Sequence, residues 1–509
     1  MSERPYLAVR AIAAPLTALA LLALTACLSA CSTQQDVQPT LRAIDAQRLG
    51  VTAADAHDVA EQVAPWWEAY GDAQLNALIT QALHDNPSMQ VAQSRLRRVQ
   101  AMETYTRGTD KPQLQATAEA DREHFSEHGL FPPPLGGSSL TLGTLQLEGS
   151  WELDLFGRQR AELDAAIGQS SAAQADMQAA GLVLSTQVAR SYVQLARLQA
   201  QREVHARTLA QREEMLSLIR QRVQAGLDTQ VELKQGEGAL PDVRMQLEAI
   251  DEQISLTRHA LAVMTGQAPQ ALDQLNVAED AIKALPAPEH IPVDLLARRA
   301  DVMAALWRVQ ASGHQVDAAR AMFYPNIDMN FYAGYNAIGL DQLLKASSAQ
   351  WGLLPAIHLP LFDADRRRAN LQGKVADQDA AQASYNQVVL QAVQEAADHI
   401  SSAQSIARQQ REQAAAQHSA EAAYSLAESR YQAGLGTYLT VLSAETAVLT
   451  QRRQGVDLRA RAADAQLALV RALGGSLQDA SAATSAAPIA TPAASQDHKQ
   501  AAVHAGDPS

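Results

Sequence analysis

Two long stretches without proline limit the folds open to this chain more than any other feature. Residues 158–222 and 363–430 are rich in alanine and glutamine, and apolar residues recur in them at spacings of four and three. That period is typical of long, packed helices. A helix over 158–222 would be about 100 Å long at a rise of 1.5 Å per residue, several times the diameter of a compact domain. The sequence therefore predicts an elongated molecule built around two rods.

Each rod follows a segment in which apolar and polar residues alternate, a period of two that indicates a half-buried strand. The segments predicted as strands are 113–121, 140–156, 326–331 and 351–362. A bulge is expected at Gly143-Thr144, where the alternation slips by one residue. Shorter helices are predicted over 72–107, 231–265, 293–322 and 439–473. The chain is thus expected to be mixed but mainly α-helical.

The order of helix, two strands and long helical hairpin occurs twice. The segments 222–227 and 430–435 are identical at five of six positions, and Gly226 and Gly434 suit the left-handed turn that ends a helix. Three pairs of landmarks lie 206 to 213 residues apart, which indicates a duplication. We therefore predict a first repeat over 72–292 and a second over 293–475.

The length of the returning helices predicts how the repeats stack. Each is about half as long as its rod, so a second helix must complete the return to the strands. We expect the helix over 293–322 to continue the helix over 231–265, and the helix over 72–107 to continue the helix over 439–473.

The first 31 residues have the pattern of a bacterial lipoprotein signal, with an apolar run and the only two cysteines of the chain. Each cysteine ends a lipobox-like tetrad. We expect the lipid on Cys31, because a polar segment follows it; Cys27, the alternative, still lies within the apolar run. Residues 32–71 then form a periplasmic tether, and the Ala/Ser/Pro-rich residues 476–509 a disordered tail.

Composition excludes several classes of function. With at most one useful thiol, disulfides, zinc-thiolate sites and a cysteine nucleophile are not expected. A formal charge of −14 makes nucleic acid an unfavourable partner. The sequence holds no paired-histidine metal motif and no nucleophile elbow, so we predict no enzyme, no metal and no cofactor. After the leader no segment is long and apolar enough for a transmembrane helix, so a membrane would be crossed by strands.

Four strands cannot close a barrel, and an open sheet edge in a bilayer leaves backbone groups without hydrogen-bond partners. The chain must therefore oligomerise if its strands cross a membrane. Two copies would supply eight strands and three would supply twelve, and this reasoning allows either.

The strand-to-rod segment 151–158, the two hairpin ends and Phe323-Tyr324-Pro325 together resemble the TolC-like outer-membrane factors of tripartite efflux pumps, in their lipoprotein branch. The resemblance extends from about Trp66 to Gly475. It implies a homotrimer in which four strands per chain form a transmembrane β-barrel and the helical hairpins form a periplasmic α-barrel. The segment 305–326 is similar to members associated with export of fusaric acid or other aromatic acids.

The resemblance also implies partners and site residues. The channel would lie in the outer membrane, held by lipid, and receive small toxic compounds from an inner-membrane efflux pump through a periplasmic adaptor, or membrane fusion protein. The adaptor would contact the hairpin tips, which consist of Arg222, Gly226, Leu227, Arg430, Gly434 and Leu435.

A gate is expected after the second tip, where the best-known members of this family carry an arginine and two aspartates. Gly436, Thr440 and Ser443 occupy those positions here, so none of the three ionic residues is present. The predicted gate is held by packing and uncharged hydrogen bonds of Tyr431, Tyr438, Thr440 and Ser443 and responds little to pH between about 4 and 7. The alternative is that other acids, such as Glu445, line the entrance.

A second class of function remains open. A lipid-anchored periplasmic coiled-coil protein, such as an adaptor or a structural envelope protein, would account for the lipobox and the rods. It would not account for four alternating strands at the ends of the rods.

Overall fold

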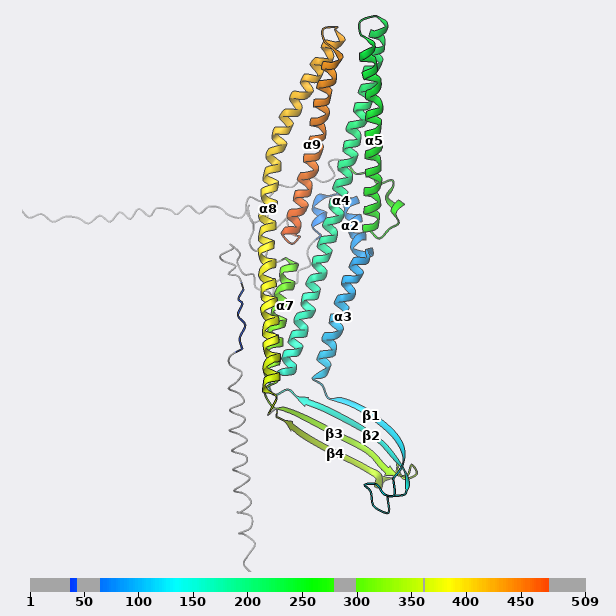
Figure 1. Cartoon of the computed structure of the whole chain (residues 1–509), viewed down its shortest axis with the longest axis vertical. Coiled ribbons are helices and arrows are strands. Elements are labelled where there is room, and N and C mark those ends of the chain that lie inside the picture. Colours follow the sequence, from blue (N-terminus) through cyan, green and yellow to red (C-terminus); the bar gives the residue numbers. More distant parts are fainter. Residues whose placement is uncertain (1–36, 44–64, 279–298, 360–361, 476–509) are drawn as a thin grey trace, which may run out of the picture.

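The computed structural model describes residues 37–43, 65–278, 299–359 and 362–475. A sheet lies at one end and a layer of long helices extends from it, ending in two hairpin tips (Figure 1). The expected signal segment with Cys27 and Cys31, most of the tether, residues 293–298 and the tail lie outside the described residues.

The helices and strands follow the predicted order. After η3 (Trp66–Tyr70), the first repeat contains α2 (Ala73–Asp85), α3 (Pro87–Thr109), β1 (Gln113–His124), β2 (Ser139–Leu153), α4 (Arg158–Gln224), α5 (Gln230–Met264) and η4 (Pro269–Leu272). The second contains α7 (Ala300–Ala321), β3 (Asn326–Ile338), η5 (Ala346–Ser348), β4 (Ala349–His358), α8 (Ala364–Gln432) and α9 (Tyr438–Ala472). The rods α4 and α8 have 67 and 69 residues, close to the predicted lengths.

The four strands form one antiparallel sheet in the order β1-β2-β3-β4. Alternation gives it an apolar face, on which Leu147 and Trp351 are 50% and 80% exposed, and a polar face with Gln115 paired opposite Glu148. Within the described residues, β1 and β4 each have one edge without a strand partner. The sheet therefore offers two different faces and two open edges.

The expected bulge at Gly143-Thr144 is wrong, because the β1–β2 register continues unbroken through both residues. The slip in the alternation has another cause. A side chain at Gly143 would meet the δ-carbons of Leu340 and Leu343 at 2.9 and 3.2 Å. The two leucines belong to the β3–β4 loop and cover Gly143, so this position of β2 needs no apolar side chain of its own.

The strand before the first rod ends at Leu153 rather than at Phe156. An Asp154 carboxylate oxygen accepts a hydrogen bond from the backbone N–H of Arg160 at 2.8 Å, which satisfies a free donor in the first turn of α4. Gly157 then adopts a left-handed conformation, with φ of 76°, and α4 begins. The side chain that looked like part of the strand therefore caps the helix.

The predicted stacking of the shorter helices is also wrong. The end of α5 meets the start of α3, and the end of α9 meets the start of α7, so each returning helix stacks on the helix that leads into the strands of its own repeat (Figure 1). At the first junction, Asn86 Nδ2 donates to the carbonyl of Met264 at 2.7 Å. At the second, Arg299 Nη1 donates to the carbonyl of Ala472 at 3.2 Å. Both bonds satisfy carbonyls that a helix end leaves unpaired, and length alone could not show which helix supplies them.

The helix expected over 72–107 is two helices. Asn86 ends α2 and caps α3, with its side-chain oxygen accepting from the N–H of Ser88 at 2.8 Å, and Pro87 occupies the first turn of α3. The separate α2 packs Leu75 and Ile79, both fully buried, against the middle of α4. Among the described helices none has the length and apolar character of a membrane span.

Candidate functional site

The two hairpin tips lie at the end of the molecule farthest from the sheet (Figure 1). Gly226 and Gly434 have φ of 75° and 77°, as the sequence predicts for left-handed turns. The N–H of each following leucine donates to the carbonyl of the arginine five residues earlier, at the end of the rod, in both cases at 2.8 Å. Leu227 and Leu435 are left 65% and 78% exposed. The two tips thus have equivalent exposed apolar side chains.

The two tip arginines have different environments. Arg430 is exposed, whereas the Arg222 side chain is only 13% exposed. Arg222 holds Asp228 with two hydrogen bonds, of 3.0 and 3.2 Å, and its Nη1 donates to the carbonyl of Tyr431 at 3.3 Å. Its guanidinium carbon also lies 4.7 Å from the centre of the Tyr431 ring. Arg222 therefore links the first tip to the second.

Tyr431 completes this link from the other side. Its side chain is fully buried, and its hydroxyl donates to Asp228. Tyr438 packs beside it, with ring centres 6.1 Å apart, in a cluster that includes Met215 and Ile219 of the first rod. Tyr431 thus holds the two hairpins together through packing and through a bond to a carboxylate.

The electrostatics of this contact favour an ionised Asp228. Burial alone would raise the pKa of its carboxyl, but the hydrogen bonds from Arg222 and Tyr431 outweigh burial and lower it. Burial and the bond to Asp228 raise the pKa of the Tyr431 hydroxyl, which stays protonated. The expectation that Tyr431 makes only uncharged hydrogen bonds is therefore corrected.

The four residues predicted for the gate do not gather in one place. Tyr431 and Tyr438 lie together between the hairpins, but Thr440 and Ser443 are exposed on α9. The residue that sequence reasoning missed is Asp228. Alignment of the repeats would have found it, since Asp228 occupies in the first tip the position that Gly436 occupies in the second.

Glu445 does not face the solvent of the single chain. It is 8% exposed and pairs with Arg212 of α4, whose Nε lies 3.1 Å from a carboxylate oxygen. Arg212 also donates to the carbonyl of Ala239 in α5, at 3.1 Å. Burial raises the pKa of Glu445, and Arg212 offsets part of that rise. This pair is a second polar link between the hairpins.

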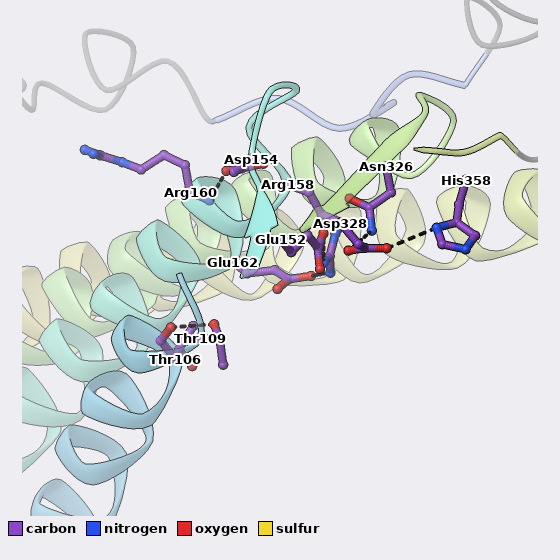
Figure 2. A network of polar contacts seen from close by, with 10 residues as sticks. All are labelled: Thr106, Thr109, Glu152, Asp154, Arg158, Arg160, Glu162, Asn326, Asp328 and His358. Carbon is purple, nitrogen blue, oxygen red and sulfur yellow. Dashed lines mark hydrogen bonds and ion pairs between the residues drawn. The ribbon is translucent and has the colours of Figure 1, made fainter. Parts of the chain in front are cut away.

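A separate polar network joins the sheet to the rods (Figure 2). Arg158, at the start of α4, pairs with Glu152 of β2 and with Glu162 one turn along the helix. On the neighbouring strands, His358 Nδ1 lies 3.1 Å from Asp328. The Arg158 contacts connect β2 to the first turns of α4, and the His358 contact connects β4 to β3. In the part of the chain that the structure describes, no cluster of histidine, cysteine or acidic residues could hold a metal ion.

A sheet with one apolar and one polar face, continued by rods of about 100 Å that end in paired tips, fits the class of outer-membrane channels with a helical extension. The sequence model described as outer membrane efflux protein matches residues 78–267 and 291–475. The chain belongs to this family, and its function is efflux across the outer membrane.

Individual relatives agree with this assignment. The chain is 35% identical to the fusaric acid resistance protein FusA of Burkholderia cepacia over 364 residues, which cover 70% of this chain and 68% of the relative. It is 30% identical to the putative multidrug resistance outer membrane protein MdtQ of Escherichia coli K12, over 88% of this chain and 95% of the relative. The solved outer membrane protein VceC of Vibrio cholerae is 36% identical, with a TM-score of 0.76 over 81% of this chain and 98% of its own.

Proposed function

We propose that this efflux protein is the outer-membrane duct of a tripartite system, passing small toxic compounds from an inner-membrane pump and a periplasmic adaptor to the outside. The observation that carries the proposal is the placement of a two-faced sheet and two exposed tips at opposite ends of the rods. One end suits a membrane and the other suits a periplasmic partner. The similarity to a fusaric acid resistance protein favours aromatic acids among the exported compounds.

The open edges of the sheet favour assembly into a homotrimer. β1 and β4 lie at opposite edges and run antiparallel to each other, so β1 of one copy can pair with β4 of the next. Such head-to-tail contacts form a closed ring when the rotation between copies allows it. Three copies give twelve strands, whereas the interior of an eight-stranded barrel is filled by side chains.

The tips are the proposed contact with the adaptor. A strain that lacks the gene should become sensitive to the exported compounds, and the wild-type gene should restore resistance. Leu227→Glu combined with Leu435→Glu should abolish that rescue, because both leucines are exposed apolar side chains of the turns. Charged or bulky residues at Gly226 and Gly434 should act alike.

The matched control for the tips is Leu130→Glu, since Leu130 is 92% exposed in the loop between β1 and β2, at the sheet end. It should rescue resistance fully, and all variants should assemble. Photo-crosslinkers at positions 227 and 435 should capture the adaptor. Rescue by the double leucine variant, or crosslinkers that capture no adaptor, would reject the tip contact.

Lipid is proposed on Cys31, which is followed by the described segment 37–43. Val37 packs against Leu371 and Val375 of α8, about 10 Å along the helix from its first residue. The six residues from Cys31 to Val37 span at most about 20 Å, enough to reach the sheet end of the rods. Mass spectrometry of the mature protein should find a lipid-modified cysteine 31 at the N-terminus, and Cys31→Ser should abolish the modification. A mature chain that begins at Cys27 would contradict the choice.

A further inference from the structure

Residues 37–43, here called the strap, lie along the second rod although they are far from it in sequence. Val37 is 9% exposed and packs in a small apolar cluster with two residues of α7 and two of α8. The cluster members are Val316, Ala319, Leu371 and Val375, with Phe323 packed against them. An extended segment therefore has a buried side chain, which a free linker would lack.

Asp379 holds the middle of the strap. Its carboxylate accepts from the backbone N–H groups of Thr40 and Leu41, each at 2.9 Å, and from the Thr40 hydroxyl at 2.7 Å. The bonds from Leu41 and Thr40 lower the pKa of Asp379, so the carboxylate remains charged at neutral pH. Hydrogen bonds to an ionised acceptor are about twice as strong as neutral ones.

Two further contacts continue the same line. Asn386 Nδ2 donates to the carbonyl of Arg42 at 3.0 Å, and an Arg320 nitrogen lies 3.4 Å from the side-chain oxygen of Gln38. The strap thus meets residues 371, 375, 379 and 386 of α8 in rising order as its own numbers rise. It runs parallel to α8, and its N-terminal end points toward the sheet.

We infer that the strap is a docked part of the helical layer and that Asp379 is the positioning residue that fixes it there. The seam between α7 and α8 is then a binding site for the chain's own N-terminal segment. Docking of the strap keeps the N-terminal part of the chain next to α7 and α8, on the side of the second rod. A lipid on Cys31, which rests on the proposed function, would be confined beside the second rod, whereas docking of the strap needs no lipid.

Trypsin tests the docking on the purified full-length protein, because Arg42 lies within the strap. Cleavage requires a stretch of chain to leave the surface, so the docked strap should resist at Arg42. In Asp379→Ala, cleavage at Arg42 should become at least tenfold faster, measured by mass spectrometry of the released fragment. Asp377→Ala is the matched control, since Asp377 lies two residues away and pairs with Lys374 of the same helix, at 3.6 Å.

Two more variants keep the test decisive. Thr40→Val removes only the hydroxyl bond to Asp379, so its rate of cleavage at Arg42 should lie between those of the wild type and Asp379→Ala. This variant still tests the inference if Asp379→Ala fails to fold. Cys31→Ser should leave the protection unchanged, so loss of lipid and loss of docking are told apart. If trypsin cuts the folded wild-type protein at Arg42 as fast as it cuts Asp379→Ala or Thr40→Val, the inference is wrong.

Discussion

Tyr431→Phe is expected to make the channel leak, because we propose that the contact between the two hairpins holds its tip end closed. The variant keeps the buried ring and loses only the hydroxyl that donates to Asp228. A hydrogen bond to a charged group contributes about 1.5–3 kcal/mol, so the open fraction should rise by about ten- to a hundredfold. Single-channel recordings of the purified protein in planar bilayers measure this fraction directly.

Ser443→Ala is the comparison for this result, because Ser443 was predicted for the gate but is exposed on α9. It should behave as wild type. If Ser443→Ala opens the channel and Tyr431→Phe does not, the gate lies on the exposed face of α9 and not in the contact between the hairpins.

The pH dependence of the same recordings has a defined sign. Because the pKa of Asp228 is lowered in the folded chain, its contribution to the closed state is present above the ordinary value of 3.8 and is lost as pH falls through the lowered pKa. The open fraction should therefore be flat between about 4 and 7 and rise only in stronger acid. A steep change above the ordinary glutamate value of 4.5 that disappears in Glu445→Gln would instead assign the response to Glu445, whose pKa burial raises.

Arg299→Met is expected to lower the stability of the folded chain. The Arg299 side chain is 6% exposed and binds Asp301, Glu395 and the carbonyl of Ala472 at the junction of α9 with α7. The variant removes the donor to the carbonyl of Ala472 and the hydrogen bonds to Asp301 and Glu395, whose side chains are 44% and 26% exposed. A hydrogen bond to a charged group contributes about 1.5–3 kcal/mol. Thermal unfolding followed by circular dichroism should show a clearly lower midpoint.

Arg308→Met is the control for the junction. Arg308 pairs with Asp176 in the same helical layer, but both side chains are about half exposed, at 45% and 49%. Exposed pairs contribute about 0–1 kcal/mol, so the midpoint should hardly move. Arg299→Lys should be intermediate, since lysine keeps the charge but lacks the planar fork of arginine. An Arg299→Met protein that melts with the wild type would show that the stacking of α9 on α7 does not depend on this residue.

The candidate site was only partly predictable. The tip glycines and leucines were found from the repeat, since a left-handed turn after a long helix leaves a local signature. Asp228 was missed because one of its two partners, Tyr431, lies in the other hairpin, 203 residues away along the chain. The partner of Asp379 lies 339 residues away along the chain, at a distance that no local pattern reports.

The sequence by itself determined the two rods, the four strands, their order and the turns at the tips, because each depends on periodicity and on residues close along the chain. Only the tertiary structure decided which helices stack end to end, that β2 pairs with β1 without a bulge, and which charged residues pair between the hairpins. These features depend on contacts between distant segments. By helix length alone, Asn86 and Arg299 could each have bound the end of either returning helix. In the structure each binds a carbonyl at the end of the returning helix of its own repeat, because the helices of one repeat pack against each other.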